Sequence, residues 1–480
     1  MPFSLRSRYV FLPLILSLVT LTLFMLRFSF GPYSHQTPEE KPGLKPHPLY
    51  KTSKPEKPPP LLREYFPLAA SAKSPVDLPP IPSWNKPPEP HVPENTRLYI
   101  GFTRYWPLLQ QVVVSYITAG WPPSDIYVVE NTGTFDANKN GLLTSANPFY
   151  MDYHRLTDIL GVNVMTTPAL QSFAQLQNLY LSEAINNNLS YYFWAHMDTV
   201  PQTHEDAVLY KSLYEIAVEV IRESVAPGYR VDEKTGKEGR WAIRFFSYDW
   251  LALVNTAAYV EVGGWDSMIS YYGTDCDMHS RLAMNGFTTP IADAGKVFDV
   301  GDSLRDLEVL YRRKTKARAV RREDRITGST FDDEKQVVSV GDGGNVNTTN
   351  PKTNSTTPSA TPIPVPAPSS IPASSGANKK YLEETEQDTL GSTTWKELQV
   401  TLEAMAEAKR QDPYRNSWQL KQRGGQGEPF YYDADGWEQA LQMTIATGGK
   451  IMEEKWGHEG CDLREVGLGE GDQWRVEHDR

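Results

Sequence analysis

Cysteine and basic charge are both scarce in this sequence. Only two of the 480 residues are cysteines, Cys276 and Cys461, too few for a disulfide-stapled scaffold or a cysteine zinc site. The two cysteines allow one long-range bridge at most. The 48 basic residues are outnumbered by 59 acidic ones, which gives a formal net charge of −11. Because a nucleic-acid surface needs clustered basic residues, this balance argues against DNA or RNA as a partner.

Long hydrophobic runs and phosphate-binding glycine loops are also rare. The mean hydropathy of −0.48 excludes a polytopic membrane protein. No GxGxxG or GxxxxGK[S/T] pattern follows the first predicted strand, residues 97–105. Neither a dinucleotide-binding loop nor a P-loop is therefore supported.

One apolar run differs from the rest of the chain. Residues 9–26 carry no charge, and this length is enough to cross a bilayer as a helix. Arg6 and Arg8 precede the run, so we expect residues 1–8 in the cytoplasm and a transmembrane signal anchor over residues 9–30. The alternative is a cleaved signal peptide, but the run is long for one and no small-residue cleavage site follows it. This topology predicts a single-pass type II protein of the Golgi or endoplasmic reticulum membrane, with its main domain in the lumen.

Proline is unevenly distributed and marks the segments that flank the folded parts. Eighteen of the 37 prolines lie in residues 32–93, so we expect residues 31–94 to form an extended stem. Residues 331–380 are predicted to be a disordered low-complexity loop. Residues 381–480 are rich in tryptophan, which predicts an extension that packs on the main domain. Three N-glycosylation tripeptides mildly support a lumenal location: they start at Asn188, Asn347 and Asn354.

Strands and helices alternate between residues 95 and 330, which we take as the catalytic domain. Apolar strands are predicted over residues 97–105, 126–133, 162–168, 191–200 and 240–249. Start signals predict helices at Pro107, at Ser172 with a capping box to Gln175, at Thr203, at Thr274 and, in the extension, at Thr394. This alternation predicts an α/β fold with a mostly parallel sheet and helices on both faces. Ligands of such sheets bind beyond the carboxyl ends of the strands.

Polar residues mark that edge of the predicted sheet. They follow three of the strands, at Glu130-Asn131, at His196 to Asp198 and at Ser247 to Asp249. Alternation along a strand would place His196 and Asp198 on one face, where they could hold a divalent cation. The alternative is that Asp198 caps a turn and His196 is a hydrogen-bonded core residue.

A second polar cluster follows a Gly263-Gly264-Trp265-Asp266 sequence. Asp275 and Asp277 fall in the first turn of a predicted helix, where the helix dipole favours negative charge. A carboxylate at such a helix start, facing a cleft, could act as a general base. Plainer interpretations remain open, because the glycines could serve only a tight turn and Arg281 could serve only as the ion-pair partner of Asp277.

The order of these motifs resembles that of glycosyltransferases with the GT-A fold. The resemblance lies in the His-x-Asp strand end, the long helix, GGWD and the T-D-x-D-x-x-x-R-L-x-x-x-G-F pattern that starts at Thr274, and it covers roughly residues 97–305. The single anchor and proline-rich stem are similar to those of Golgi glycosyltransferases, and the whole resembles a fungal-type membrane-anchored transferase. The resemblance implies a UDP- or GDP-sugar donor and a glycan or glycoprotein acceptor.

The resemblance also implies a metal site. In GT-A enzymes an Asp-x-Asp motif binds Mn²⁺ or Mg²⁺, which neutralises the leaving diphosphate. Asp198 matches the last acid of that motif, and His196 stands where the first acid is expected. Asp299 or Asp302 is a candidate for a later ligand, and His458 is a more distant one.

Further roles follow from the same resemblance. Glu130 and Asn131 match the residues that grip the donor nucleoside, and Arg281 is a candidate for its phosphates. Asp275 matches the carboxylate that deprotonates the acceptor hydroxyl in inverting members, and Asp277 is the second candidate. Trp265 and Gly264 would line the acceptor pocket.

Three functions are compatible with these patterns. The leading one is a metal-dependent glycosyltransferase with an aspartate base, whose retaining or inverting outcome stays open. The alternative is a membrane-tethered carbohydrate-binding or scaffold protein on a degenerate transferase fold, which His196 in place of an acid favours. A metal-dependent hydrolase using His196 and Asp198 is weaker, because a fuller His/Asp cluster would be expected. In an oxidising lumen the two cysteines could pair and tie the extension to the helix at Thr274.

Overall fold

The structure is a computed structural model that describes residues 63–232, 237–314, 386–414, 416–420, 422–428, 430 and 434–477. The predicted cytoplasmic tail and anchor, the first half of the predicted stem and the predicted loop over residues 331–380 lie outside these residues. Across the described ranges, no helix combines the length and the apolar character needed to span a bilayer.

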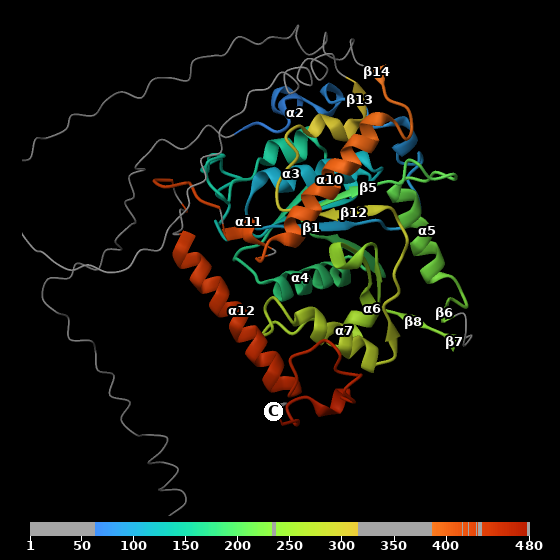
Figure 1. The fold of residues 1–480 in the computed structure, drawn as a ribbon, viewed down its shortest axis with the longest axis vertical. Helices are drawn as coiled ribbons and strands as arrows, with labels where there is room; N and C mark the ends of the chain where they lie inside the picture. Colours follow the sequence, from blue (N-terminus) through green and yellow to red (C-terminus); the bar gives the residue numbers. More distant parts are fainter. Residues whose placement is uncertain are drawn as a thin grey trace, which may run out of the picture. The chain divides into compact units, whose positions relative to one another are not determined.

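A six-stranded sheet lies at the centre of the fold (Figure 1). Its order is β3-β2-β1-β4-β10-β9, and β10 alone runs antiparallel to its neighbours. The strands are β1 (Leu98–Phe102), β2 (Ile126–Glu130), β3 (Asn163–Thr166), β4 (Tyr191–Ala195), β9 (Ile243–Phe245) and β10 (Leu251–Asn255). The α/β class with a mostly parallel sheet is confirmed.

Helices cover both faces of the sheet because apolar side chains alternate along its strands. In β1, Leu98 and Ile100 join one core, while Tyr99 joins the core on the other face. The first core includes side chains from α3 (Trp106–Thr118), α5 (Leu213–Val225) and α10 (Thr393–Gln411). The second includes side chains from α4 (Phe173–Asn186), α6 (Thr256–Glu261) and α7 (Thr274–Met284).

Capping residues set the starts of the helices, and two helices begin at other residues than predicted. The capping box of Ser172 and Gln175 is present at the start of α4. The helix expected from Thr203 instead begins at Leu213, because Ser212 forms a capping box with Glu215. Helix α10 is capped by Ser392, whose side chain accepts the backbone N–H of Trp395, rather than by Thr394.

Two strands expected to be continuous are broken. The strand expected over 191–200 ends at Ala195, and a separate strand, β5 (Thr199–Gln202), pairs antiparallel with β12 (Lys296–Asp299). His196 and Asp198 therefore lie in a turn rather than on one face of a strand. The strand expected over 240–249 divides into β8 (Arg240–Trp241) and β9. Strand β10 was not predicted: its apolar run is short and is followed directly by α6.

The carboxyl-terminal half of the predicted stem packs on the domain instead of forming an extended spacer. Short helices α2 (Pro67–Ser71), η2 (Pro75–Asp77) and η3 (Ser83–Asn85) lie within it. Phe66 and Ala69 are buried in the first core, and the Asn85 side chain donates to the carbonyl of Thr118 at 2.8 Å. Proline density did not prevent packing, because several prolines occupy first helical turns, where no backbone N–H is needed.

The carboxyl-terminal extension contributes α10, α11 (Ser417–Leu420), α12 (Ala434–Trp456) and η8 (Glu470–Asp472). In Figure 1 α10 crosses near β12, and α12 runs past α7. Trp395, Trp418 and Trp456 are buried. A disulfide joins Cys276 in α7 to Cys461, with their Cα atoms 4.6 Å apart.

The remaining elements are short. They are η4 (Pro123–Asp125), η5 (Arg155–Ile159), β6 (Arg230–Asp232), β7 (Lys237–Glu238), η6 (Tyr248–Trp250), β11 (Phe287–Thr288), η7 (Leu307–Tyr311), β13 (Arg313–Lys314) and β14 (Glu386–Gln387).

Candidate functional site

The candidate site lies beyond the carboxyl end of β4. His196 and Asp198 occupy the turn that connects β4 to β5. The pairing of β5 with β12 sets Asp299 opposite Thr199, and the backbone N–H of Val300 donates to the Asp198 carbonyl at 2.8 Å. Asp198 and Asp299 are therefore brought together across this small sheet, although they are far apart in the sequence.

A lysine from the extension lies between these two carboxylates. The Nζ of Lys409 is 2.6 Å from Oδ2 of Asp198 and 2.5 Å from Oδ1 of Asp299. The indole Nε1 of Trp418 also donates to Oδ2 of Asp198, at 3.1 Å. Burial by itself would raise the pKa of Asp198, but the charges of Lys409 and His196 and the hydrogen bonds from Lys409 and Trp418 together hold that pKa below its ordinary value. The carboxylate is thus fixed in its charged form.

As they lie, these residues do not fit the divalent cation that a GT-A-like fold implies. A metal at this site would need oxygen atoms of Asp198 and Asp299, and both carboxylates already pair with one ammonium group. Within the part of the chain that the structure describes, no three His, Cys, Asp or Glu side chains are grouped so as to hold a metal ion. The lysine thus takes the space between the two acids.

His196 connects this pair to a third carboxylate. Its Nδ1 is 3.9 Å from Oδ1 of Asp198, and its Nε2 is 3.6 Å from Oδ2 of Asp249. Burial alone would lower the pKa of His196, but the nearby carboxylates, Asp249 first and then Asp198 and Asp299, raise it. Asp249 lies in η6, directly after the turn at Ser247, whose φ is +80°. The histidine is one-third exposed, so it is the accessible member of this group.

Asp275 and His279 lie one turn apart on α7, at the other side of the site. Asp275 is half-buried in the first turn of the helix. Burial lowers the pKa of His279, against the opposing charges of Asp275 and Asp249, so its imidazole is neutral at neutral pH. Among the described residues the Nε2 atom of His279 has no hydrogen-bond partner. This pair offers a carboxylate and a neutral imidazole for proton transfer.

Aromatic rings join the two sides. Phe173 stacks on His196 with 6.0 Å between ring centroids and meets Trp265 edge-on at 5.6 Å. Trp265 in turn lies 6.1 Å from His279. Trp265 is buried, and its backbone is held by both groups of the Asn178 side-chain amide. It is therefore part of an aromatic wall between His196 and His279, and a role in lining the acceptor pocket stays a prediction.

Asp277 and Arg281 form a buried ion pair. The Arg281 guanidinium donates to Asp277 at 2.8–2.9 Å and to the carbonyls of Val262 and Gly264. Asp277 also meets Nζ of Lys455 at 2.6 Å and Nε1 of Trp456 at 3.0 Å. These contacts favour a structural role for both residues, and roles in donor binding and catalysis stay predictions.

Gly264 adopts a left-handed turn, with φ of +74°. A Cβ there would lie 2.8 Å from Oδ1 of Asn178, so the position requires glycine for both reasons. The turn directs the chain into Trp265, and a role for Gly264 in acceptor binding stays a prediction.

Glu130 and Asn131 are enclosed at the end of β2. Glu130 accepts hydrogen bonds from Thr132, Asn138 and Tyr153. The Asn131 side chain exchanges two hydrogen bonds with the backbone of Gln171. These contacts hold the loops that follow β2 and β3, and a role in binding the donor nucleoside stays a prediction.

Five residues of the site are not among the predicted site residues; one of them, Phe173, directly follows the Ser172 cap of α4. Asp249 and His279 had a sequence signal, because one follows a strand and the other is four residues from Asp275. Lys409 and Trp418 had none of this kind, since no motif includes them. The signal for Lys409 is the helical pattern of α10, in which it continues the buried stripe of Leu398, Leu402 and Ala406, whereas Trp418 lies in α11, outside that pattern.

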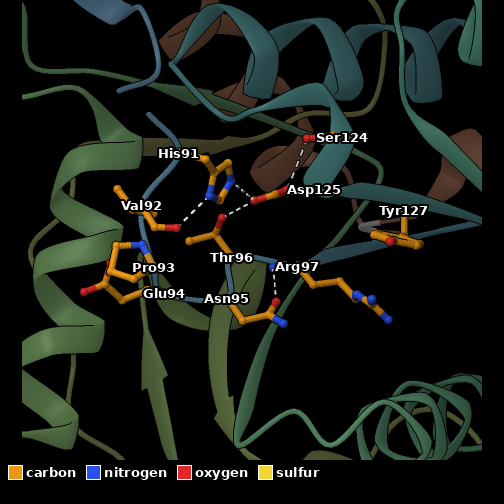
Figure 2. Close-up of a pocket in the computed structure, with 10 residues that line it drawn as sticks. All are labelled: His91, Val92, Pro93, Glu94, Asn95, Thr96, Arg97, Ser124, Asp125 and Tyr127. Carbon is orange, nitrogen blue, oxygen red and sulfur yellow. Dashed lines mark hydrogen bonds and ion pairs between the residues drawn. The ribbon is translucent and has the colours of Figure 1, made fainter. Parts of the chain in front are cut away.

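A separate pocket of about 320 Å³ lies at the opposite, amino-terminal edge of the sheet (Figure 2). It is lined by the segment that precedes β1 and by residues around the start of β2. Its polar groups are paired with one another: His91 meets Asp125 at 2.9 Å, and the Arg97 guanidinium lies 4.4 Å from the Tyr127 ring centroid. None of the predicted site residues lines this pocket.

No protein-family model matches the sequence, and no curated protein is similar to it. Among solved structures, a mannosyltransferase from Pyrobaculum calidifontis in complex with GDP-Man and Mn²⁺ is 10% identical, with a TM-score of 0.29 over 44% of this chain and 58% of that one. A cytidylyltransferase from Leptospira borgpetersenii is 10% identical, with a TM-score of 0.26 over 42% and 76%. The chain thus spans less than two thirds of the mannosyltransferase. Neither likeness is close enough to support an inference about activity.

Proposed function

We propose that this protein is a glycosyltransferase that moves a sugar from a nucleoside-diphosphate-sugar to a hydroxyl of a glycan or glycoprotein. The observation that carries this proposal is the grouping of His196, Asp198, Asp249 and Asp299 beyond the carboxyl end of β4, where ligands of open α/β sheets bind. A purely structural role would not need so many ionisable groups at that edge.

In this proposal the two sides of the site have separate tasks. The β4 side receives the donor, with His196 as its accessible polar group. The α7 side takes the acceptor proton, with Asp275 as the base, and the neutral His279 beside it is the second candidate. The half-buried ring of Phe173, backed by the buried Trp265, forms the apolar wall between them, against which a sugar ring can pack.

The test is a screen of UDP- and GDP-sugars with the purified protein, followed by kinetics of Asp275→Asn. Loss of a general base should lower kcat by about 10²- to 10⁴-fold while the protein stays folded. Asp293→Asn, which alters an exposed carboxylate, is the matched control and should retain activity. Turnover by Asp275→Asn at the wild-type rate would exclude Asp275, and His279→Gln would then be tested in the same assay.

A second candidate function is a non-catalytic binding protein on the same fold. The position of Lys409 favours it, because an ammonium between the two acids could serve only to fix the extension. Nucleotide-sugar binding without release of nucleoside diphosphate, across the whole donor screen, would support this candidate.

We also propose that the domain lies in the lumen of the secretory pathway. The Cys276–Cys461 disulfide supports this location, because such bonds persist in oxidising compartments. Asn188, the first residue of a glycosylation tripeptide, is exposed. A mobility shift of the cellular protein on glycosidase treatment, absent in Asn188→Gln if this is the modified site, tests the proposal.

A further inference from the structure

The ammonium group of Lys409 lies between Asp198 and Asp299, where the resemblance to GT-A glycosyltransferases implies a metal ion. Both carboxylates belong to the core of the domain, whereas the ammonium that joins them comes from α10 in the extension. Lys409 is 3% exposed, and Asp198 and Asp299 are 8% and 10% exposed. A buried charge is stable only when it is paired, so the three groups depend on one another.

Packing fixes the lysine in this position. Leu398, Leu402 and Ala406 lie on the same stripe of α10 and belong to the first core. The Trp418 indole closes the group by donating to Asp198 and lies 6.0 Å from the ring of Tyr105. Lys409 thus lies on a helix face that is buried along its length, and its Nζ cannot leave the carboxylates without moving that face.

We propose that the Nζ of Lys409 is the built-in cation of this site: it takes the place between Asp198 and Asp299 that a divalent metal would take, and the protein binds its donor without metal. This inference rests on the proposed function for the identity of the donor, but its central claim concerns the cation alone. A divalent ion could enter only by displacing the ammonium, which would leave a buried, unpaired positive charge.

The first test uses the wild-type full chain and Mn²⁺ alone. Titration followed by electron paramagnetic resonance and by thermal shift should detect no bound Mn²⁺ at this site. Binding of one Mn²⁺ per chain that is lost in Asp198→Asn would overturn the inference. This measurement requires no variant of Lys409, so it decides the question even where such a variant fails to fold.

The second test removes the ammonium. Lys409→Met leaves the two carboxylates and His196 facing one another, so this variant should gain a Mn²⁺ site and a rise in melting temperature on adding Mn²⁺. Lys455→Met is the matched control: it removes the other buried lysine that pairs with two aspartates, but Arg281 still neutralises Asp277 there. It should gain no Mn²⁺ site. A folded Lys409→Met that binds no Mn²⁺ would show that the position is not a cation site and would overturn the inference.

The third test separates this inference from the proposed function. UDP and GDP are titrated into the wild type in excess EDTA and in Mn²⁺, and equal affinity in the two conditions is expected. Binding that requires Mn²⁺ would overturn the inference and leave the proposed function standing. If neither UDP nor GDP binds in either condition, this counts against the proposed function, and the Mn²⁺ titrations above still decide the role of Lys409.

Discussion

The carboxyl-terminal extension places a lysine and a tryptophan beside two aspartates of the domain, Asp198 and Asp277. The charged groups around these two aspartates differ. The Asp198 carboxylate is 2.6 Å from Nζ of Lys409 and 3.1 Å from Nε1 of Trp418. The Asp277 carboxylate is 2.6 Å from Nζ of Lys455 and 3.0 Å from Nε1 of Trp456. At Asp277 the guanidinium of Arg281 adds a second cation. Each lysine also meets a second carboxylate, Asp299 in the Asp198 group and Asp266 in the Asp277 group, so the guanidinium is what distinguishes them.

This difference separates a structural cluster from a candidate site. The cluster around Asp277 carries enough positive charge to satisfy its acids, and a disulfide joins the same helix to the extension. The group around Asp198 has one ammonium for two carboxylates, and a one-third exposed histidine beside it. A group with excess acid and an accessible polar side chain suits ligand binding, whereas a neutralised, fully buried one suits anchoring.

The largest expected difference between the two groups is the loss of unfolding free energy when each aspartate is replaced by alanine. Asp277→Ala leaves the buried Arg281 without its carboxylate and Lys455 with Asp266 alone, and it should lower the free energy of unfolding by about 3–5 kcal/mol. Asp198→Ala should cost about 2 kcal/mol, because Lys409 keeps its pair with Asp299. Urea unfolding of both variants checks the order. Equal losses would mean that the two groups anchor the extension alike.

The disulfide should strengthen only one of the two attachments. It joins residues 185 positions apart, and its removal in a Cys276→Ser, Cys461→Ser double variant should cost about 2–4 kcal/mol. The rate of backbone amide hydrogen exchange should then rise in α12, near Asp277, and stay unchanged in α10, near Asp198. Reduction of the wild type with dithiothreitol is the parallel experiment. A rise in α10 of the same size would contradict the separation of the two attachments.

The smallest effect concerns pH. Burial alone would raise the pKa of Asp266, but the hydrogen bond and charge of Lys455 outweigh it and hold that pKa below its ordinary value of 3.8. A carboxyl whose folded pKa is depressed stabilises the fold above its unfolded pKa and loses that contribution as pH falls through the folded value. The stability difference between wild type and Asp266→Asn should therefore be constant above about pH 4 and shrink below it.

Unfolding free energies measured from neutral pH down to pH 2 check this. A difference that persists unchanged at the lowest pH would show that Lys455 does not act on Asp266 through charge. Asp293→Asn, at an exposed carboxylate, supplies the baseline for a carboxyl that has no such partner.

Local signals were sufficient for much of the fold. Alternation along the strands separated the two cores, and the Ser172–Gln175 box started α4 where expected. The errors came where tertiary context overrode a local pattern. The chain turns at His196 instead of continuing β4, and β10 pairs antiparallel between β4 and β9, a choice that only the finished sheet dictates.

The sequence by itself determined that His196 and Asp198 follow a buried strand, that Asp275 begins a helix, and that Lys409 falls on the apolar stripe of another. Only the tertiary structure decided that this lysine meets Asp198 across 211 residues and Asp299 across 110. The physical reason is that the periodicity of a helix or strand predicts which side chains are buried, but it does not predict which residues they contact in the folded protein. For an apolar side chain that matters little, whereas for a buried charge the partner decides its role.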